Sequence, residues 1–196
     1  MKIFFGITGS VAATLDEKLI NALIHADHEV KVVRTFSSLY FQKKSFWKIL
    51  FKAFCSKVFK TNMAQSSRVE SWTDFDEWPG WYYKKNQKIL HIALRDWADV
   101  LVIAPLSANM LAKLANGLCD NLLTCIVRAW SLDKPMIVAP AMNTMMWQHP
   151  VTSEHLKRLG SWYKLTVVSP VSKKLACGDT GIGAMAEIQN IVRAIN

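Results

Sequence analysis

The feature that most constrains the fold is a series of five short apolar runs, rich in isoleucine and valine, spread along the chain. Runs of about 4–8 such residues that end in small or turn residues are typical of parallel strands buried on both faces. The predicted strands are "KIFFGIT" (Lys2–Thr8), "EVKVVRT" (Glu29–Thr35), "DVLVIAP" (Asp99–Pro105), "PMIVAPA" (Pro135–Ala141) and "KLTVVS" (Lys164–Ser169).

Helical patterns lie between these strands. Leu15, Leu19, Leu23 and Ile24 mark one face of a helix after the first strand. Another helix carries Met110, Leu111 and Leu114 and ends near Gly117, and "DNLLTCIVRAW" begins with an acid suited to a helix N-terminus. Strands that alternate with helices predict an α/β fold with a doubly wound parallel sheet.

Length and composition favour a single domain over residues 1–196. The chain is 51% hydrophobic and 20% charged, which suits one sizeable core. No apolar run reaches the roughly 20 residues of a membrane-spanning helix. The start, "MKIFFGITGSVAA", has the layout of a secretory signal, but Gly6, Thr8 and Gly9 interrupt it, so a first strand is favoured.

The four cysteines form no C-x-x-C pair, which predicts neither a zinc site nor a thioredoxin-type dithiol. So few cysteines suit free thiols in a reducing compartment, and we expect a cytoplasmic protein. Cys119 and Cys125 stand in apolar surroundings and are expected to fill the core.

The net charge of +9 is concentrated in one stretch. Six lysines and no acid lie between Gln42 and Lys60, and Lys44, Lys48 and Lys52 recur at helical spacing beside an apolar stripe. This pattern predicts an amphipathic helix with a solvated basic face, with binding to a membrane surface or a partner as the alternative. No nucleic-acid-binding motif accompanies the charge, so no nucleic-acid partner is expected.

Small polar segments follow four of the predicted strands: "GSVAA", "TFSS", "PLSAN" and "PAMN". Ligands of doubly wound sheets bind beyond the carboxyl ends of the strands. Gly9 and Ser10 lead into a helix, whose N-terminus favours a phosphate, although the G-x-G-x-x-G spacing and the Walker lysine are absent. Four such turns at one edge indicate a phosphorylated planar cofactor. The alternative is that they are merely short strand–helix turns.

Three residues, one of them the last residue of "PAMN", are suited to chemistry. His91 is a natural proton acceptor near neutral pH, although a lone histidine among apolar residues is more often structural. Asn143 can donate a hydrogen bond to a carboxylate. Cys177 lies in the glycine-rich "LACGDTGIGAMAE" and can supply a proton or act as a nucleophile on a closing flap. The spacing of these three residues in the sequence does not show that their side chains meet.

Long motifs across nearly the whole chain resemble the homo-oligomeric flavin-containing cysteine decarboxylases. The P-A-M-N-x-x-M-W pattern and the cysteine-bearing flap are the most specific of them. The matching pieces are "GITGSVAA" (Gly6–Ala13), "DEW" (Asp76–Trp78), "LHIALRDWADVLVIAPLSAN" (Leu90–Asn109), "GLCDNLLTCIVRAW" (Gly117–Trp130), "KPMIVAPAMNTMMW" (Lys134–Trp147) and "KKLACGDTGIGAMAE" (Lys173–Glu187).

The resemblance implies a Rossmann-like, flavodoxin-type parallel sheet with helices on both faces, assembled as homotrimers or multiples of trimers with FMN at the subunit interface. It implies His91 and Cys177 as catalytic residues. It implies a phosphorylated small-molecule substrate bound by Asn143, Met145, Lys174 and Ala176. The implied FMN-binding residues are Gly9, Ser10, Val11, Thr35, Ser37, Ser38, Ser107, Ala108, Asn109, Met110, Ala141 and Met142. No metal is implied.

The activity implied is FMN-dependent decarboxylation of 4′-phosphopantothenoylcysteine to 4′-phosphopantetheine in coenzyme A biosynthesis. The alternatives are a peptidyl-cysteine decarboxylase, which lacks the flap thiol, and a non-catalytic regulatory or partner subunit, which loses part of the His/Asn/Cys set. A flavin prenyltransferase is more distant. Two departures from the family pattern stand out: Met110 where relatives have threonine, and an insertion-like segment around residues 46–66 with its basic helix.

Overall fold

The computed structural model describes residues 1–41, 69–78, 85–174, 178 and 180–196. Its central feature is a parallel sheet with the strand order β3-β2-β1-β4-β5-β6. Every neighbouring pair of strands in this sheet is parallel, so all the carboxyl ends lie at one edge. The strands are β1 (Lys2–Ile7), β2 (Glu29–Arg34), β3 (Glu70–Thr73), β4 (Val100–Leu106), β5 (Pro135–Pro140) and β6 (Lys164–Val167), and a separate antiparallel hairpin contains β7 (Val171–Lys174) and β8 (Thr180–Ala184).

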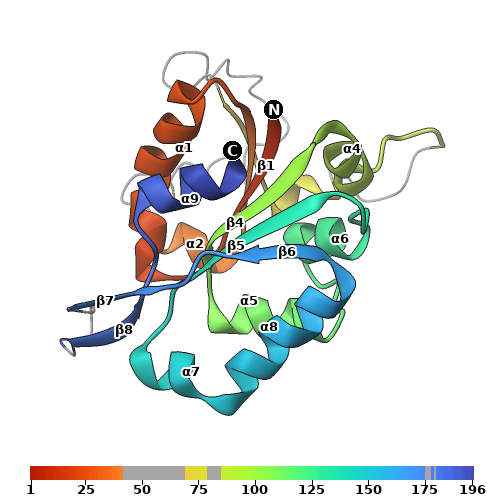
Figure 1. The fold of residues 1–196 in the computed structure, drawn as a ribbon. Coiled ribbons are helices and arrows are strands. Elements are labelled where there is room, and N and C mark those ends of the chain that lie inside the picture. Colours follow the sequence, from red (N-terminus) through yellow and green to blue (C-terminus); the bar gives the residue numbers. More distant parts are fainter. Residues whose placement is uncertain (42–68, 79–84, 175–177, 179) are drawn as a thin grey trace.

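Helices cover both faces of the sheet (Figure 1). Helices α1 and α9 pack on one face, and α4, α5, α6 and α8 pack on the other. The α-helices are α1 (Asp16–His25), α2 (Phe36–Leu39), α4 (Leu90–Trp97), α5 (Ala108–Ala115), α6 (Leu122–Arg128), α7 (Thr144–Gln148), α8 (Pro150–Trp162) and α9 (Ile188–Ile195), with 3₁₀ turns η1 (Val11–Leu15) and η2 (Asp74–Asp76).

The strands form two cores because alternate side chains point to opposite faces of a sheet. In β1, Ile3, Phe5 and Ile7 join the core under α1 and α9, and Phe4 joins the core on the other face. All seven residues of β4 are buried. This two-sided burial explains why the strands appear in the sequence as continuous apolar runs, and it confirms the predicted doubly wound α/β fold.

The five predicted strands and the helices between them are confirmed, with ends that differ by one or two residues. The start of the chain forms β1, as favoured over a secretory signal. In "DNLLTCIVRAW" the helix begins at Leu122 and is capped by the Asn121 side chain, which accepts from the backbone N–H of Thr124 at 2.9 Å. The expected acid, Asp120, lies just outside that helix.

Several elements were not predicted from the sequence, among them the strands β3, β7 and β8. Strand β3 is short and lies at the edge of the sheet, so it has no fully buried residue and leaves no apolar run. Strand β8 forms within the glycine-rich segment, pairs with β7 and lies beside α7 (Figure 1). The basic helix expected between residues 43 and 60 and the insertion-like segment 46–66 lie outside the described residues.

Within the described ranges, no helix combines the length and the apolar composition needed to cross a membrane. The same ranges contain no cluster of three or more histidine, cysteine or acidic side chains suited to a metal ion.

Candidate active site

The segments after β1 and β2 touch each other at the carboxyl edge. A Cβ atom built on Gly9 would lie 2.6 Å from Cβ of Ser37, so only glycine permits this approach. The Thr35 hydroxyl lies 3.2 Å from the Ser37 hydroxyl, and the backbone N–H of Thr35 donates to the carbonyl of Ile7 at 3.1 Å. Two of the predicted FMN segments are therefore one continuous surface.

Hydroxyl groups dominate this surface, but they are not all available to a ligand. The Ser10 side chain caps η1 by accepting from the backbone N–H of Ala12 at 3.4 Å, next to the half-exposed Val11. Ser38 is fully buried, and its hydroxyl donates to the carbonyl of Thr35 at 2.7 Å. Hydroxyls and backbone N–H groups suit a phosphate.

A buried threonine joins the first segment to the one after β4. The Thr8 hydroxyl donates to the carbonyl of Pro105 at 2.7 Å and accepts from the backbone N–H of Ser107 at 2.8 Å. Ser107 then caps α5, since its hydroxyl accepts from the backbone N–H of Met110 at 3.3 Å. The Met110 side chain is buried in the core under α5, whereas Ala108 is half-buried and Asn109 is exposed at the start of the helix.

The fourth segment, after β5, is held by two neighbours. Ala141 is buried and donates its backbone N–H to the carbonyl of Leu106 at 3.0 Å. Met142 donates to the carbonyl of Gly183 in β8 at 2.9 Å. A Cβ atom on Gly183 would lie 2.3 Å from the Met142 carbonyl oxygen, and Gly183 has φ +149°. Glycine at this position lets the hairpin lie directly against the segment.

Asn143 caps α7, its side-chain oxygen accepting from the backbone N–H of Met145 at 2.8 Å. Met145 itself is 74% exposed. Nearby, the hydroxyl of Thr144 is buried without a hydrogen-bond partner among the described residues, and a Cβ atom on Gly181 would lie 2.4 Å from it. The four segments, α7 and the hairpin therefore form one side of a candidate ligand site.

His91 lies in the first turn of α4, where its Nδ1 is 2.5 Å from Oε1 of Glu77. The Glu77 side chain is 4% exposed and the His91 side chain 21%. The residue after Glu77, Trp78, is 70% exposed. His91 is thus partly exposed, and its ring contacts the buried carboxylate of Glu77.

The segment that carries Glu77 is tied to the second cofactor segment by Asp74. The Asp74 carboxylate accepts from the backbone N–H of Phe36 and from that of Leu122, each at 3.1 Å. Burial raises the pKa of Asp74 above its ordinary value, and these two hydrogen bonds act in the opposite direction.

The expectation that Cys119 fills the core is wrong, because Cys119 is exposed. Cys125 is partly buried, and its thiol lies 3.4 Å from the carbonyl oxygen of Cys119. Burial, with smaller contributions from Cys119 and Glu77, raises the pKa of Cys125 to about 11. Cys119 lies in the turn before α6, and Cys125 lies within that helix. The position of this turn at the surface could not be predicted from composition.

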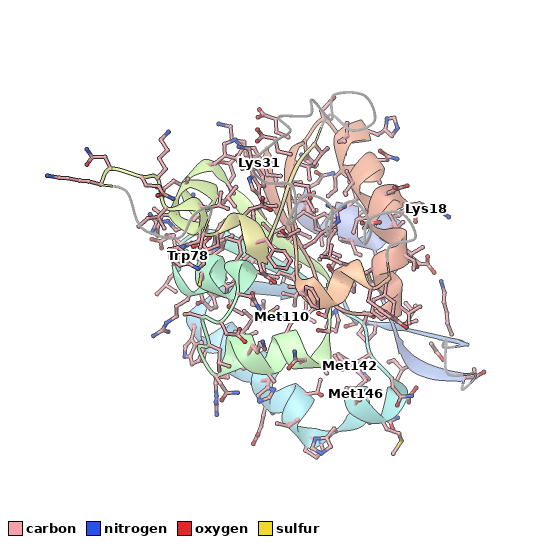
Figure 2. The ribbon with its side chains drawn as sticks, turned by 180° about the vertical axis from the view of Figure 1, so that it is seen from behind. Lys18, Lys31, Trp78, Met110, Met142 and Met146 are labelled. Carbon is pink, nitrogen blue, oxygen red and sulfur yellow. The ribbon has the colours of Figure 1, made fainter. Side chains whose placement is uncertain are left out.

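His91 and Asn143 do not meet within one chain. Helix α4 and helix α7 lie at different ends of the molecule in Figure 1, and Figure 2 shows Trp78 well away from Met142 and Met146. Lys174 ends β7 and pairs with Thr180, but Ala176 and Cys177 lie outside the described residues.

Sequence reasoning missed Glu77 and Thr8. Glu77 stands in the quoted "DEW" motif, but an acid beside aromatic residues in an irregular stretch gives no sign that it is buried. Thr8 ends a predicted strand, and its two bonds to the β4 end depend on the strand order, which the sequence does not state.

Comparison with known proteins places the chain in a family. The chain matches the Flavoprotein family over residues 1–196. It is 47% identical over 186 residues to the rice protein named phosphopantothenoylcysteine decarboxylase, covering 95% of this chain and 75% of that protein.

Two solved structures are similar over nearly the whole chain. The first is a PPC decarboxylase mutant with a cysteine-to-serine substitution, complexed with pantothenoylaminoethenethiol (TM-score 0.83, 44% identity, 99% of this chain and 95% of that chain). The second is the FMN-binding protein AtHal3 (TM-score 0.79, 45% identity, 99% and 94%). By its sequence and by its fold, this chain belongs to the Flavoprotein family.

Proposed function

We propose that the protein is an FMN-dependent carboxy-lyase that converts 4′-phosphopantothenoylcysteine to 4′-phosphopantetheine in coenzyme A biosynthesis. The observation that carries this proposal is the set of four small polar segments meeting at the carboxyl edge of the sheet, in a chain 47% identical to a protein named for this activity. The same edge is where doubly wound sheets bind nucleotide-like cofactors.

FMN, when bound, would accept a hydride from the cysteinyl group before carbon dioxide is lost and would return it afterwards, an exchange of electrons for which protein side chains are not suited. The residues proposed to hold it are those of the four segments. Ser10, with the hydroxyls of Thr35 and Ser37, accounts for the phosphate. The backbone at Ser107–Met110 and at Ala141–Met142 would contact the flavin ring. The buried Met110 side chain cannot replace the hydroxyl that a threonine would offer there.

The residues proposed to act on the substrate divide into two groups. Asn143, Met145, Lys174 and Ala176 bind it, with the Asn143 amide donating to its carboxylate. His91 holds or moves a proton at Nε2, and Cys177 donates its thiol proton to the two-carbon unit left after carbon dioxide departs. The hairpin strands β7 and β8, which flank Cys177, exclude water when they close over the substrate.

The assembly we propose is a homotrimer, or a multiple of trimers, with FMN at the subunit interface. The separation of His91 from Asn143 within one chain supports it, because a neighbouring copy can bring the two together. The exposed side chains of Val11, Phe36, Phe75 and Trp78 are apolar surface that such contacts would bury. A cytoplasmic location belongs to the same proposal and is supported by the free thiols of Cys119 and Cys125.

The test is to incubate the purified, FMN-loaded protein with 4′-phosphopantothenoylcysteine and to measure carbon dioxide and 4′-phosphopantetheine. One equivalent of each per substrate consumed is expected. Release of neither, from protein that carries its flavin, would contradict the proposal. A peptide ending in cysteine serves as the competing substrate. Faster turnover of that peptide would favour the peptidyl-cysteine alternative, which the presence of Cys177 disfavours.

Ser10→Asp is expected to weaken FMN binding, because it sets a negative charge against the cofactor's phosphate. Aspartate caps helices as well as serine does, so η1 should keep its start. The measurement is an FMN titration of the apo protein by flavin fluorescence. Ser161→Asp, on the exposed end of α8, is the matched control and should bind FMN normally. Unchanged affinity in Ser10→Asp would remove Ser10 from the phosphate site.

Asn143→Asp is expected to abolish turnover and to leave FMN bound. The aspartate oxygen can still accept from the backbone N–H of Met145, so α7 should keep its cap. What changes is the charge, and two carboxylates facing each other repel. The measurement is the rate of carbon dioxide release with flavin content checked by absorbance. Activity near that of the wild type would show that Asn143 does not face the substrate carboxylate.

A further inference from the structure

We propose that Glu77 is a positioning residue that keeps the ring proton of His91 on Nδ1, so that Nε2 is the nitrogen presented to the reacting group. The assignment of Nε2 to the reaction rests on the proposed function. The tautomer itself does not, because it follows from the contact between the two side chains.

The first argument is the burial of Glu77. Its side chain is 4% exposed, and Oε2 has no hydrogen-bond partner in the part of the chain that the structure describes. Burying a carboxylate with one oxygen unsatisfied is unfavourable. Even a paired buried charge contributes little stability compared with well-packed apolar residues. Glu77 is therefore poorly explained by folding alone.

The second argument is the way the chain before Glu77 is held. Asp76 accepts from the backbone N–H of Thr73 at 2.8 Å, which fixes the turn η2 at the end of β3. Asp74 accepts from backbone N–H groups at the start of α2 and of α6. These bonds attach the turn to three neighbouring elements, so the Glu77 carboxylate is presented to α4 from a rigid support.

The third argument concerns which ring nitrogen carries the proton. An ionised carboxylate only accepts hydrogen bonds, so the Nδ1 atom 2.5 Å from Oε1 must be the donor. In the neutral ring the proton is then on Nδ1, and Nε2 has the free lone pair. In the charged ring Nε2 carries a second proton. Either form exposes only Nε2 to a proton exchange, and the choice of nitrogen is set by Glu77.

The neighbouring thiol does not compete for Nδ1. Cys125 is close enough to Glu77 to be affected by its charge, and its pKa is raised to about 11, chiefly by burial. Near neutral pH this thiol is uncharged and therefore a weak acceptor. Among the described residues, Glu77 is the group that accepts from Nδ1 of His91.

The direct test is an NMR spectrum of the FMN-loaded protein with ¹⁵N-labelled histidine rings. The chain has five histidines, and the signals that vanish in His91→Asn identify those of His91. We expect Nδ1 protonated and Nε2 unprotonated in the neutral wild-type ring. A neutral ring with its proton on Nε2 would overturn the proposal, and this result needs no variant of Glu77 and no enzyme activity.

The variant Glu77→Gln removes the charge and keeps the shape. A glutamine can accept from or donate to Nδ1, so the tautomer should become mixed. We expect kcat to fall about 10²-fold, in the range of a lost acid–base contribution, with KM changed less than about threefold and the flavin retained. An unchanged tautomer population in a folded Glu77→Gln protein would contradict the proposal.

Asp96→Asn is the matched control, since it removes one carboxylate from α4, the helix that carries His91. Asp96 is exposed and pairs with Arg95, at 2.6 Å, rather than with His91. It should leave both the tautomer and kcat unchanged.

In the double variant Glu77→Gln/His91→Asn, turnover should be no lower than in His91→Asn alone, because Glu77 acts through His91. A further drop would mean that Glu77 acts by another route. If the wild type proved inactive on 4′-phosphopantothenoylcysteine, the proposed function would fail. The NMR measurement of the His91 tautomer would still show whether Glu77 holds the proton on Nδ1.

Discussion

Replacing His91 with asparagine is expected to lower turnover by roughly 10²- to 10⁴-fold while the protein keeps its FMN. Asparagine carries an amide N–H at about the place of Nδ1, so it can still donate to the buried Glu77. What it lacks is a group at the place of Nε2 that can take or give a proton. The substitution thus removes the group that transfers a proton and keeps the hydrogen bond to Glu77.

The measurement is carbon dioxide release from 4′-phosphopantothenoylcysteine, with flavin absorbance and thermal unfolding recorded on the same sample. His155→Asn serves as the control. His155 lies on α8, on the face of the sheet that α5 and α8 share, and should have no effect. If His91 is only structural, the order of effects reverses: protein and flavin are lost first, and any folded remainder works normally. Such an outcome would remove His91 from the reaction.

The sequence allowed the fold to be predicted because the central strands are buried on both faces. Strands such as β4, in which every residue is buried, appear in the sequence as continuous apolar runs. Such a run can be recognised without knowing which elements pack against the strand. Strand β3 is the counterexample. It lies at the edge with β2 on one side only, so no apolar run marks it.

The candidate site was predictable in part, for a similar reason. The segments after the strands could be found because parallel strands place their carboxyl ends together, and the contact of Gly9 with Ser37 agrees with that rule. The pairing of Glu77 with His91 depends instead on how β3, η2 and α4 pack, and fourteen residues separate the two along the chain. The periodicity of apolar residues carries no information on such a contact. The family resemblance covered the motifs of both residues but did not indicate that Glu77 contacts His91.

Changing Cys177 to serine is expected to separate release of carbon dioxide from completion of the product. If the cysteine is only a small flap residue, serine should fit equally well and turnover should be near normal. If its thiol is the proton donor, loss of carbon dioxide should continue, because that step needs no proton from the flap. The saturated product should then fail to form, since a serine hydroxyl is a far weaker acid than a thiol.

The expected product of Cys177→Ser is an enethiol lighter than 4′-phosphopantetheine by two hydrogen atoms. It should form at no more than about one equivalent per site, because the flavin would keep the two electrons taken from the substrate and could not oxidise another molecule. Mass spectrometry of the quenched reaction identifies it, and an anaerobic sample shows whether further substrate is turned over. Cys119→Ser, at an exposed thiol near α6, is the matched control and should give the full-mass product. Full-mass product from Cys177→Ser at the wild-type rate would leave the β7–β8 hairpin as a lid over the substrate, with the proton coming from another group.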